Sequence, residues 1–242
     1  MRIAVWRTGH EIADTVAYAI AEGACIHTDK LNDDFIKQFD VHIGYGILRG
    51  MDKVFRACGK ADKPWFNIDR GYWKPGHFDG YYRVSLCGTQ QTSDWPDPDW
   101  GRWKSLGLEI EPMAVRDGYT LVCPPTDAVE TFFGFPKNMN VPYGTLKPDH
   151  KYMLRPKGTK DPIDWDSVGK VITFNSSVGW EALRRGIPVV SDPTHSIVGA
   201  WQVRHGTDKR EELFATMAAL QLTIDEMRQG KLLPLLKKLL PI

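Results

Sequence analysis

The sequence predicts a compact α/β fold built from two Rossmann-like halves, and three observations support this prediction. Apolar strand-like segments alternate with helical segments along most of the chain, which is typical of a parallel sheet covered by helices. Residues 171–190 join two buried strand segments through a polar turn and a short helix. The 242 residues, with 42% apolar and 25% charged side chains, have the composition of a globular protein of one or two domains.

The first half begins with an apolar strand at residues 2–6 and a helix at 11–21. Ile12, Val16 and Ile20 recur on one face of that helix, and Gly23 follows its end. Further apolar runs predict strands, and helical spacing predicts more helices. The strands are 24–27, 41–45, 65–68 and 81–86, and the helices are 33–38 and 51–58. We expect these elements to form a parallel sheet in a domain of residues 1–117.

The second half follows a loop rich in Trp, Pro and Asp at residues 93–103 and a linker at 108–117. Its elements are predicted in the same way. The strands are 119–123, 151–154, 171–174 and 187–190, and the helices are 127–133, 178–185, 209–220, 224–229 and 232–240. We expect a second domain at residues 118–222 and C-terminal helices at 223–242 that pack back across the domains. The last helix is amphipathic, so binding to a membrane surface is the alternative.

The most specific motif is the run Asn-Ser-Ser-Val-Gly-Trp-Glu-Ala-Leu-Arg-Arg-Gly-Ile-Pro-Val-Val at residues 175–190. Hydroxyl groups and a glycine at a helix N-terminus, just beyond the carboxyl end of a strand, predict an anion-binding site. The alternative is an ordinary βαβ unit whose serines only cap the helix. The run resembles the donor-site signature of GT-B glycosyltransferases, in particular the capsule-polysaccharide and Kdo-type transferases. Ser177 stands where those proteins usually have Thr.

This resemblance implies two facing Rossmann-like domains of the GT-B type and a nucleotide-sugar as substrate rather than cofactor. It extends to residues 119–125, 153–158 and 211–230, and Lys157 stands where the family often has His. In the family, basic groups of the segment 153–158 would hold the donor phosphates. The alternative is that Arg155 and Lys157 are solvated surface cations. The implied donor-binding residues are Ser176, Ser177, Val178, Gly179, Glu181, Arg155, Lys157 and Thr126. The resemblance to GT-B enzymes also implies a metal-independent enzyme with no metal ligands.

The catalytic candidates lie in residues 67–83. Asp69 follows a strand at the ligand edge of the sheet, where a carboxylate can take a proton from an acceptor hydroxyl. His77 is the second candidate for the base. The alternatives are a turn or capping residue for Asp69 and an ordinary loop histidine for His77.

The expected acceptor-binding residues surround these candidates. Tyr72 and Trp73 are predicted to form a stacking platform, with Lys74 and Arg83 beside it; equally, the aromatic rings are core or interface residues. Thr8 and Gly9 form a turn between the first strand and helix. In the second half, Thr194 and His195 follow the last clear strand and are expected to contact donor or acceptor. The expected acceptor-binding residues are thus those of the stacking platform and of the first turn, namely Thr8, Gly9, Tyr72, Trp73, Lys74 and Arg83.

We therefore expect a glycosyltransferase that moves a sugar from a nucleotide-sugar to an acceptor hydroxyl. One acceptor is a hydroxylated pyrimidine in phage DNA, because compact GT-B-like enzymes occur in bacteriophages and the aromatic loop at 70–83 suits a flipped base. The other is a surface or capsular glycan, and the net charge of +1 argues against DNA. A sugar-nucleotide epimerase or hydrolase and a non-catalytic nucleotide-binding protein are the remaining hypotheses.

Localisation is expected to be cytoplasmic. The chain has no apolar run of about 18 residues and no signal-peptide pattern. Its four widely spaced cysteines are typical of buried thiols in a reducing compartment. The sequence leaves the oligomeric state open.

Overall fold

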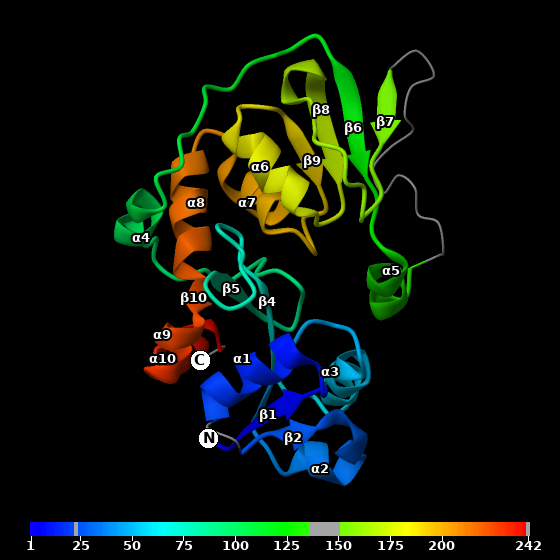
Figure 1. Ribbon diagram of the computed structural model, residues 1–242, viewed down its shortest axis with the longest axis vertical. Helices are drawn as coiled ribbons and strands as arrows, with labels where there is room; N and C mark the ends of the chain where they lie inside the picture. The colour runs from blue at the N-terminus through cyan, green and yellow to red at the C-terminus, as the bar shows by residue number, and fades with distance from the viewer. Residues whose placement is uncertain (22–23, 136–150, 241–242) are drawn as a thin grey trace. The chain divides into compact units, whose positions relative to one another are not determined.

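The computed structural model describes residues 1–21, 24–135 and 151–240, whose contacts divide the chain into two compact units (Figure 1). Unit 1 comprises Met1–Arg102 and Ala215–Ile242, and unit 2 comprises Trp103–Phe214. The contacts thus assign residues 103–117 to unit 2 and the C-terminal segment to unit 1. The expected domains 1–117, 118–222 and 223–242 remain predictions from the sequence.

Unit 1 contains one mixed sheet. Its strands are β1 (Ile3–Arg7), β2 (Ile26–His27), β3 (Val41–Tyr45), β4 (Trp65–Arg70), β5 (Tyr81–Leu86) and β10 (Gln221–Thr223), in the order β10-β5-β4-β3-β1-β2. The expected parallel arrangement holds for β1 to β4. β5 runs antiparallel to both β4 and β10. Residues 71–80 are too few for a parallel crossover, which takes about a dozen residues, so β4 and β5 form a hairpin.

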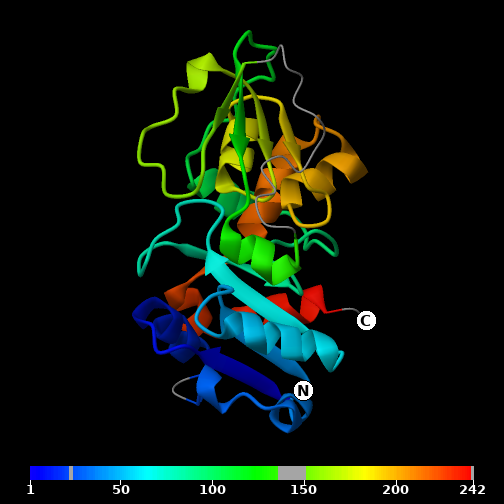
Figure 2. The ribbon, with the colours of Figure 1, turned by 90° about the vertical axis from the view of Figure 1, so that its right-hand side faces the viewer.

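The helices of unit 1 cover this sheet. They are α1 (Glu11–Ala21), α2 (Asp33–Lys37), α3 (Met51–Lys60), α4 (Trp100–Ser105, which extends into unit 2), α9 (Ile224–Arg228) and α10 (Leu232–Leu239), with a 3-10 turn η1 (Thr28–Lys30). α3 packs against the sheet (Figure 2) and contacts β3, where Gly44 leaves room for the end of the Met51 side chain, because a Cβ there would lie 2.0 Å from Met51 Cε. α10 buries the leucines of its apolar face, namely Leu232, Leu235, Leu236 and Leu239. The amphipathic pattern therefore serves packing within unit 1.

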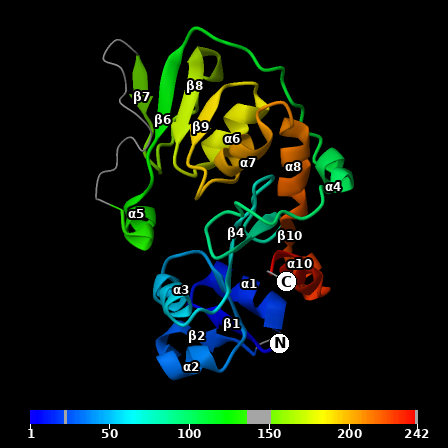
Figure 3. The same cartoon turned by 180° about the vertical axis from the view of Figure 1, so that it is seen from behind.

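Unit 2 contains a fully parallel sheet. Its strands are β6 (Tyr119–Cys123), β7 (Tyr152–Leu154), β8 (Val168–Thr173) and β9 (Val189–Ser191), which lie side by side in the order β7-β6-β8-β9 (Figures 1 and 3). Its helices are α5 (Asp127–Phe133), α6 (Ser177–Arg184), α7 (Ile197–His205) and α8 (Arg210–Ala219, which continues into unit 1), with a 3-10 turn η2 (Trp165–Ser167). The predicted α/β class with two Rossmann-like units is confirmed.

The sequence missed α7 and β10. α7 buries Ile197 and Trp201 and lacks the apolar–polar periodicity that identifies a helix. It also contains Gly199, and glycine is a poor helix former. Glycine is needed at this position because a Cβ would lie 2.6 Å from the Ser191 carbonyl oxygen. In the part of the chain that the structure describes, no helix has the length and apolar content needed to cross a bilayer.

Candidate functional site

The carboxyl ends of the parallel strands of unit 2 meet at one edge of its sheet, which we call the unit 2 edge. β6 leads to Thr126, β7 to Arg155, β8 to Ser176 and β9 to Asp192. Open α/β sheets bind ligands at this edge. Side chains from the loops that follow four neighbouring strands therefore lie at the same edge of the sheet.

The start of α6 is held firmly at the unit 2 edge. The Thr173 hydroxyl donates to the Cys123 carbonyl at 3.1 Å and accepts from the Ser176 amide at 3.1 Å. Ser176 is the N-cap, and its hydroxyl accepts from the Val178 amide at 3.3 Å. Ser177 opens the helix with an exposed side chain. The polar turn predicted from the sequence therefore forms a fixed helix N-terminus, where first-turn amides lack partners within the helix.

Gly179 faces the sheet. It is buried, and a Cβ at this position would lie 3.1 Å from Thr173 Cγ2 and 3.7 Å from Val189 Cγ1. The glycine thus lets α6 approach β8 and β9 closely. Substitution by valine at this position would disturb packing as well as any ligand contact.

Glu181, expected to contact the nucleoside or sugar, is bound to arginines of its own helix end. One carboxylate oxygen lies 2.8 Å from Arg184 Nη2 and 2.9 Å from Arg185 Nε, and the other lies 3.2 Å from Arg184 Nε. Burial favours a raised Glu181 pKa, but the hydrogen bonds and charges of the two arginines outweigh it and lower the pKa. Contact with a ligand would require these partners to be exchanged.

Two other predicted donor residues at this edge, Arg155 and Thr126, form hydrogen bonds within their own loops. The Arg155 guanidinium donates to the carbonyls of Asp161 at 2.7 Å and Thr159 at 3.3 Å. Thr126 is the N-cap of α5 and accepts from the Val129 amide at 3.3 Å. Lys157 is exposed.

A histidine–carboxylate pair follows β9 at the same edge. Asp192 Oδ1 accepts from the amides of Thr194 and His195 at 2.8 Å each and lies 2.9 Å from His195 Nδ1. The sequence singled out Thr194 and His195 only by their place after a strand. The spacing Asp-x-x-His in such a turn is the signal that would have identified the pair.

The corresponding edge of unit 1 begins with the predicted Thr8–Gly9 turn. Asp14 Oδ1 accepts from both of these amides at 3.0 Å, and Asp14 Oδ2 lies 3.3 Å from Arg7 Nη1. Thr8 Oγ1 is buried and has no hydrogen-bond partner among the described residues. The backbone donors of this turn are therefore already bound to a carboxylate of the protein.

Asp69, the predicted base, lies at the end of β4 with both oxygens engaged. Oδ2 lies 2.7 Å from Arg83 Nη2, and Oδ1 accepts from the Arg70 amide at 2.8 Å. Arg83 also donates to the carbonyls of Arg70 at 2.7 Å and Thr89 at 3.2 Å. His77 is exposed, with its ring 3.1 Å from Arg70 Nη2. Asp69 thus orients Arg83, and any role as a base requires it to accept a proton beside a guanidinium.

Tyr72 and Trp73, expected as a stacking platform, are each only 3% exposed. Burial raises the pKa of Tyr72 to about 12, and the Arg83 guanidinium lies 5.5 Å from the centre of its ring. The Trp73 amide donates to Gln221 Oε1 at 3.1 Å. The rings are therefore core side chains, which was the other interpretation of the sequence, while Lys74 beside them is exposed.

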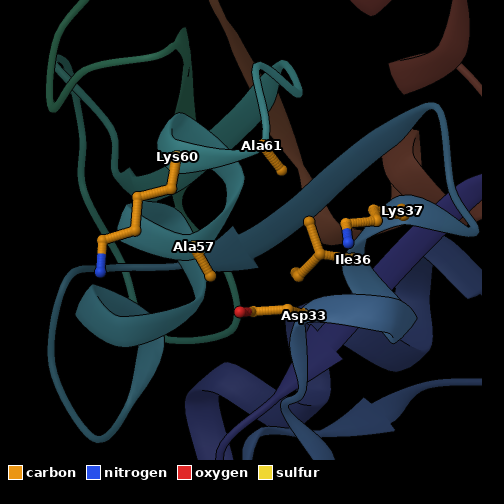
Figure 4. A pocket seen from close by; sticks show the side chains of 6 residues that line it. All are labelled: Asp33, Ile36, Lys37, Ala57, Lys60 and Ala61. Carbon is orange, nitrogen blue, oxygen red and sulfur yellow. The ribbon is translucent and has the colours of Figure 1, made fainter.

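A shallow hollow of unit 1 lies elsewhere, between α2 and α3 (Figure 4). It is lined by Asp33, Ile36, Lys37, Ala57, Lys60 and Ala61. None of the predicted site residues lines it. Within the described ranges, no group of three or more His, Cys, Asp or Glu side chains is arranged to hold a metal ion.

No family model matches the sequence, and no curated protein sequence matches it. Among solved structures, one similar chain is KpsC of Thermosulfurimonas dismutans, a β-Kdo 2,4 transferase. The two share 10% sequence identity, the match covers 91% of this chain and 90% of that chain, and the TM-score is 0.45. A likeness at this level assigns no activity.

Proposed function

We propose that this protein is a glycosyltransferase that binds the phosphate groups of a nucleotide-sugar at the unit 2 edge. The observation that carries this proposal is the capped N-terminus of α6, with Ser176 and Ser177 beside the ends of β6 and β8. A helix N-terminus and its first amides favour anions. The resemblance of residues 175–190 to the donor-site signature of GT-B enzymes supports the same assignment.

Arg155 and Lys157 are proposed to supply positive charge to the same phosphates. The Arg155 guanidinium would then exchange its loop carbonyls for a phosphate, a change of partners confined to one exposed loop. Val178, Gly179, Glu181 and Thr126 are proposed to shape this site, Gly179 by placing the helix close to the sheet.

The acceptor is proposed to be a hydroxyl compound, with Asp69 as the base and His77 as its substitute. Phage DNA is the weaker acceptor, because Tyr72 and Trp73 are too buried to stack on a flipped base and the net charge is +1. A surface or capsular glycan meets neither objection.

A nucleotide-binding protein without transfer activity is the second candidate. It is favoured by one observation, namely that both oxygens of Asp69 are bound to protein donors. In this case the unit 2 edge would bind nucleotide while no residue took the acceptor proton.

The test is a panel of UDP-, CMP- and GDP-sugars, followed by thermal shift and by release of the nucleotide. We expect at least one donor to raise the melting temperature and to be turned over in the presence of a glycan or alcohol acceptor. Stabilisation without turnover would support the nucleotide-binding alternative. Absence of any stabilisation across the panel would contradict the donor site itself.

A further inference from the structure

The Asp192–His195 pair is held in a fixed geometry, and the donor site proposed above gives these two residues no role. Asp192 accepts two backbone amides and the imidazole Nδ1, and the Ser196 amide donates to the Asp192 carbonyl at 2.9 Å. The two side chains are 17% and 21% exposed. Gly199 packs against the Asp192 backbone from α7, where a Cβ would lie 2.7 Å from the carbonyl carbon and oxygen. The turn that holds the histidine is therefore tightly determined.

Three aromatic rings hold the imidazole in place. The ring centroid of His195 lies 4.3 Å from that of Phe133, 5.0 Å from Phe174 and 5.5 Å from Phe135. Because Nδ1 faces Asp192, the second ring nitrogen, Nε2, is the atom that can meet a ligand. Nε2 has no hydrogen-bond partner among the described residues. A carboxylate on Nδ1 fixes the orientation of the ring.

This pair lies beside the start of α6. The Asp192 amide donates to the Phe174 carbonyl at 3.3 Å, two residues before the N-cap Ser176. Ser191 pairs with Thr173 across the strands, and Thr173 holds the Ser176 amide. The Ser191 side chain is 7% exposed, and its hydroxyl has no hydrogen-bond partner among the described residues. This buried hydroxyl at the carboxyl end of β9 is able to bond a polar group that enters the unit 2 edge.

We infer that His195 is a catalytic residue of the proposed transferase, whose Nε2 donates a hydrogen bond to the leaving phosphate of the nucleotide-sugar. Asp192 is the positioning residue that holds Nδ1. The inference rests on the proposed function.

In the transfer step, the bond between the anomeric carbon and the phosphate oxygen breaks, and its electron pair remains on that oxygen. The acceptor oxygen bonds to the anomeric carbon, and its proton passes to the base. His195 stabilises the negative charge that develops on the phosphate oxygen, which is where a fixed hydrogen-bond donor has the largest effect on rate.

The experiment compares the wild type with His195→Phe and the matched control His205→Phe. A phenylalanine at 195 keeps an aromatic ring among Phe133 and Phe174 but removes both nitrogens. His205 ends α7, where its ring lies 4.3 Å from that of Trp201. Calorimetry would measure the affinity for UDP, CMP and GDP and for uridine, cytidine and guanosine. We expect His195→Phe to weaken nucleotide binding about 10- to 100-fold, the range for hydrogen bonds to charged groups, with nucleoside binding and His205→Phe unaffected.

Nitrogen NMR of the wild-type imidazoles gives a readout that does not depend on the variant folding. We expect saturating nucleotide to change the Nε2 signal of His195, because a hydrogen bond to the phosphate forms at that atom. Asp192→Asn should diminish this change, because the ring loses the carboxylate that orients it. Nucleotide binding that leaves the His195 signals unchanged, or that is equally tight in His195→Phe, would overturn the inference while the donor site stands. Failure of every nucleotide to bind the wild type would instead overturn the proposed function, and this inference with it.

Discussion

The two Rossmann-like units present the same kind of edge, the carboxyl ends of parallel strands, but their polar groups are used differently. At the unit 1 edge, the predicted site residues are bound to carboxylates of the protein, as in the Thr8 and Gly9 amides with Asp14 and Arg83 with Asp69, although Thr8 Oγ1 has no partner among the described residues. At the unit 2 edge, short-range caps hold the loops, the Ser191 hydroxyl has no partner among the described residues, and His195 contacts Asp192 through Nδ1. Similar topology therefore does not give similar capacity for a ligand, because a donor that already has a buried partner must lose it before it can bind.

The largest expected effect concerns Asp69. If it is the base, Asp69→Asn should lower transfer by roughly 10²–10⁴-fold while donor affinity is retained, because the amide cannot take the proton. Rate and affinity are measured together on the same preparation, with His77→Gln as the matched variant at the second candidate. Full activity in Asp69→Asn would leave the residue with the structural task of holding Arg83, and a loss in His77→Gln alone would transfer the role to His77.

Replacing Arg83 in unit 1 and Arg155 in unit 2 compares the two edges directly, through the stability and the donor affinity of each variant. Arg83→Met removes a largely buried guanidinium that binds Asp69 and two carbonyls, so we expect the free energy of unfolding to fall by about 3 kcal/mol. Arg155→Met should lower stability by about 1 kcal/mol or less, because its carbonyl partners lie in an exposed loop, but should weaken donor binding by about 2 kcal/mol. Urea unfolding and calorimetry measure the two quantities. Equal losses of stability in both variants would contradict the distinction between the edges.

Substitutions at Ser177 distinguish an effect on the stability of α6 from an effect on phosphate binding. Ser177→Asp places a negative charge at the first turn of α6, which should stabilise the helix by about 0.3–1 kcal/mol while repelling the donor phosphates. Ser177→Asn has nearly the same shape without the charge and serves as the control. We expect a higher melting temperature with weaker donor affinity in the aspartate variant alone. Unchanged affinity in that variant would show that the phosphates bind elsewhere.

The smallest effect concerns the Glu181 pair with Arg184 and Arg185. Because the folded-state pKa is lowered, the pair contributes stability above the unfolded pKa of about 4.3, and this contribution is lost as the pH falls through the folded pKa. Denaturation in urea between neutral and acidic pH should show a shallower acid limb for Glu181→Gln. Identical acid limbs in the two proteins would mean that the pair adds nothing to the pH dependence.

Several elements of both units lie where their sequence patterns predict. The positions of β3, β5, β6 and α1 match their predicted ranges, and the polar turn at Ser176 forms the helix N-terminus that was expected. The helical face of α1 is an exception, since Ala13 and Ala17 are buried with Val16, while Ile12 and Ile20 are half-buried. The hairpin of β4 and β5 was missed, although the ten residues between these strands are too few for a parallel crossover. The helix α7, in which residues 197–201 are all buried, was missed because it lacks apolar–polar periodicity.

The sequence alone determined what short-range chemistry controls. The caps at Thr126 and Ser176 and the Asp192–His195 turn join residues two or three positions apart, so their hydrogen bonds follow from residue type and spacing. Only the tertiary structure decided which groups remain available to a ligand. Asp69 meets Arg83 14 residues away, and Trp73 meets Gln221 148 residues away. Such partners are brought together by burial of apolar surface and by strand order, which are properties of the whole fold rather than of any short segment.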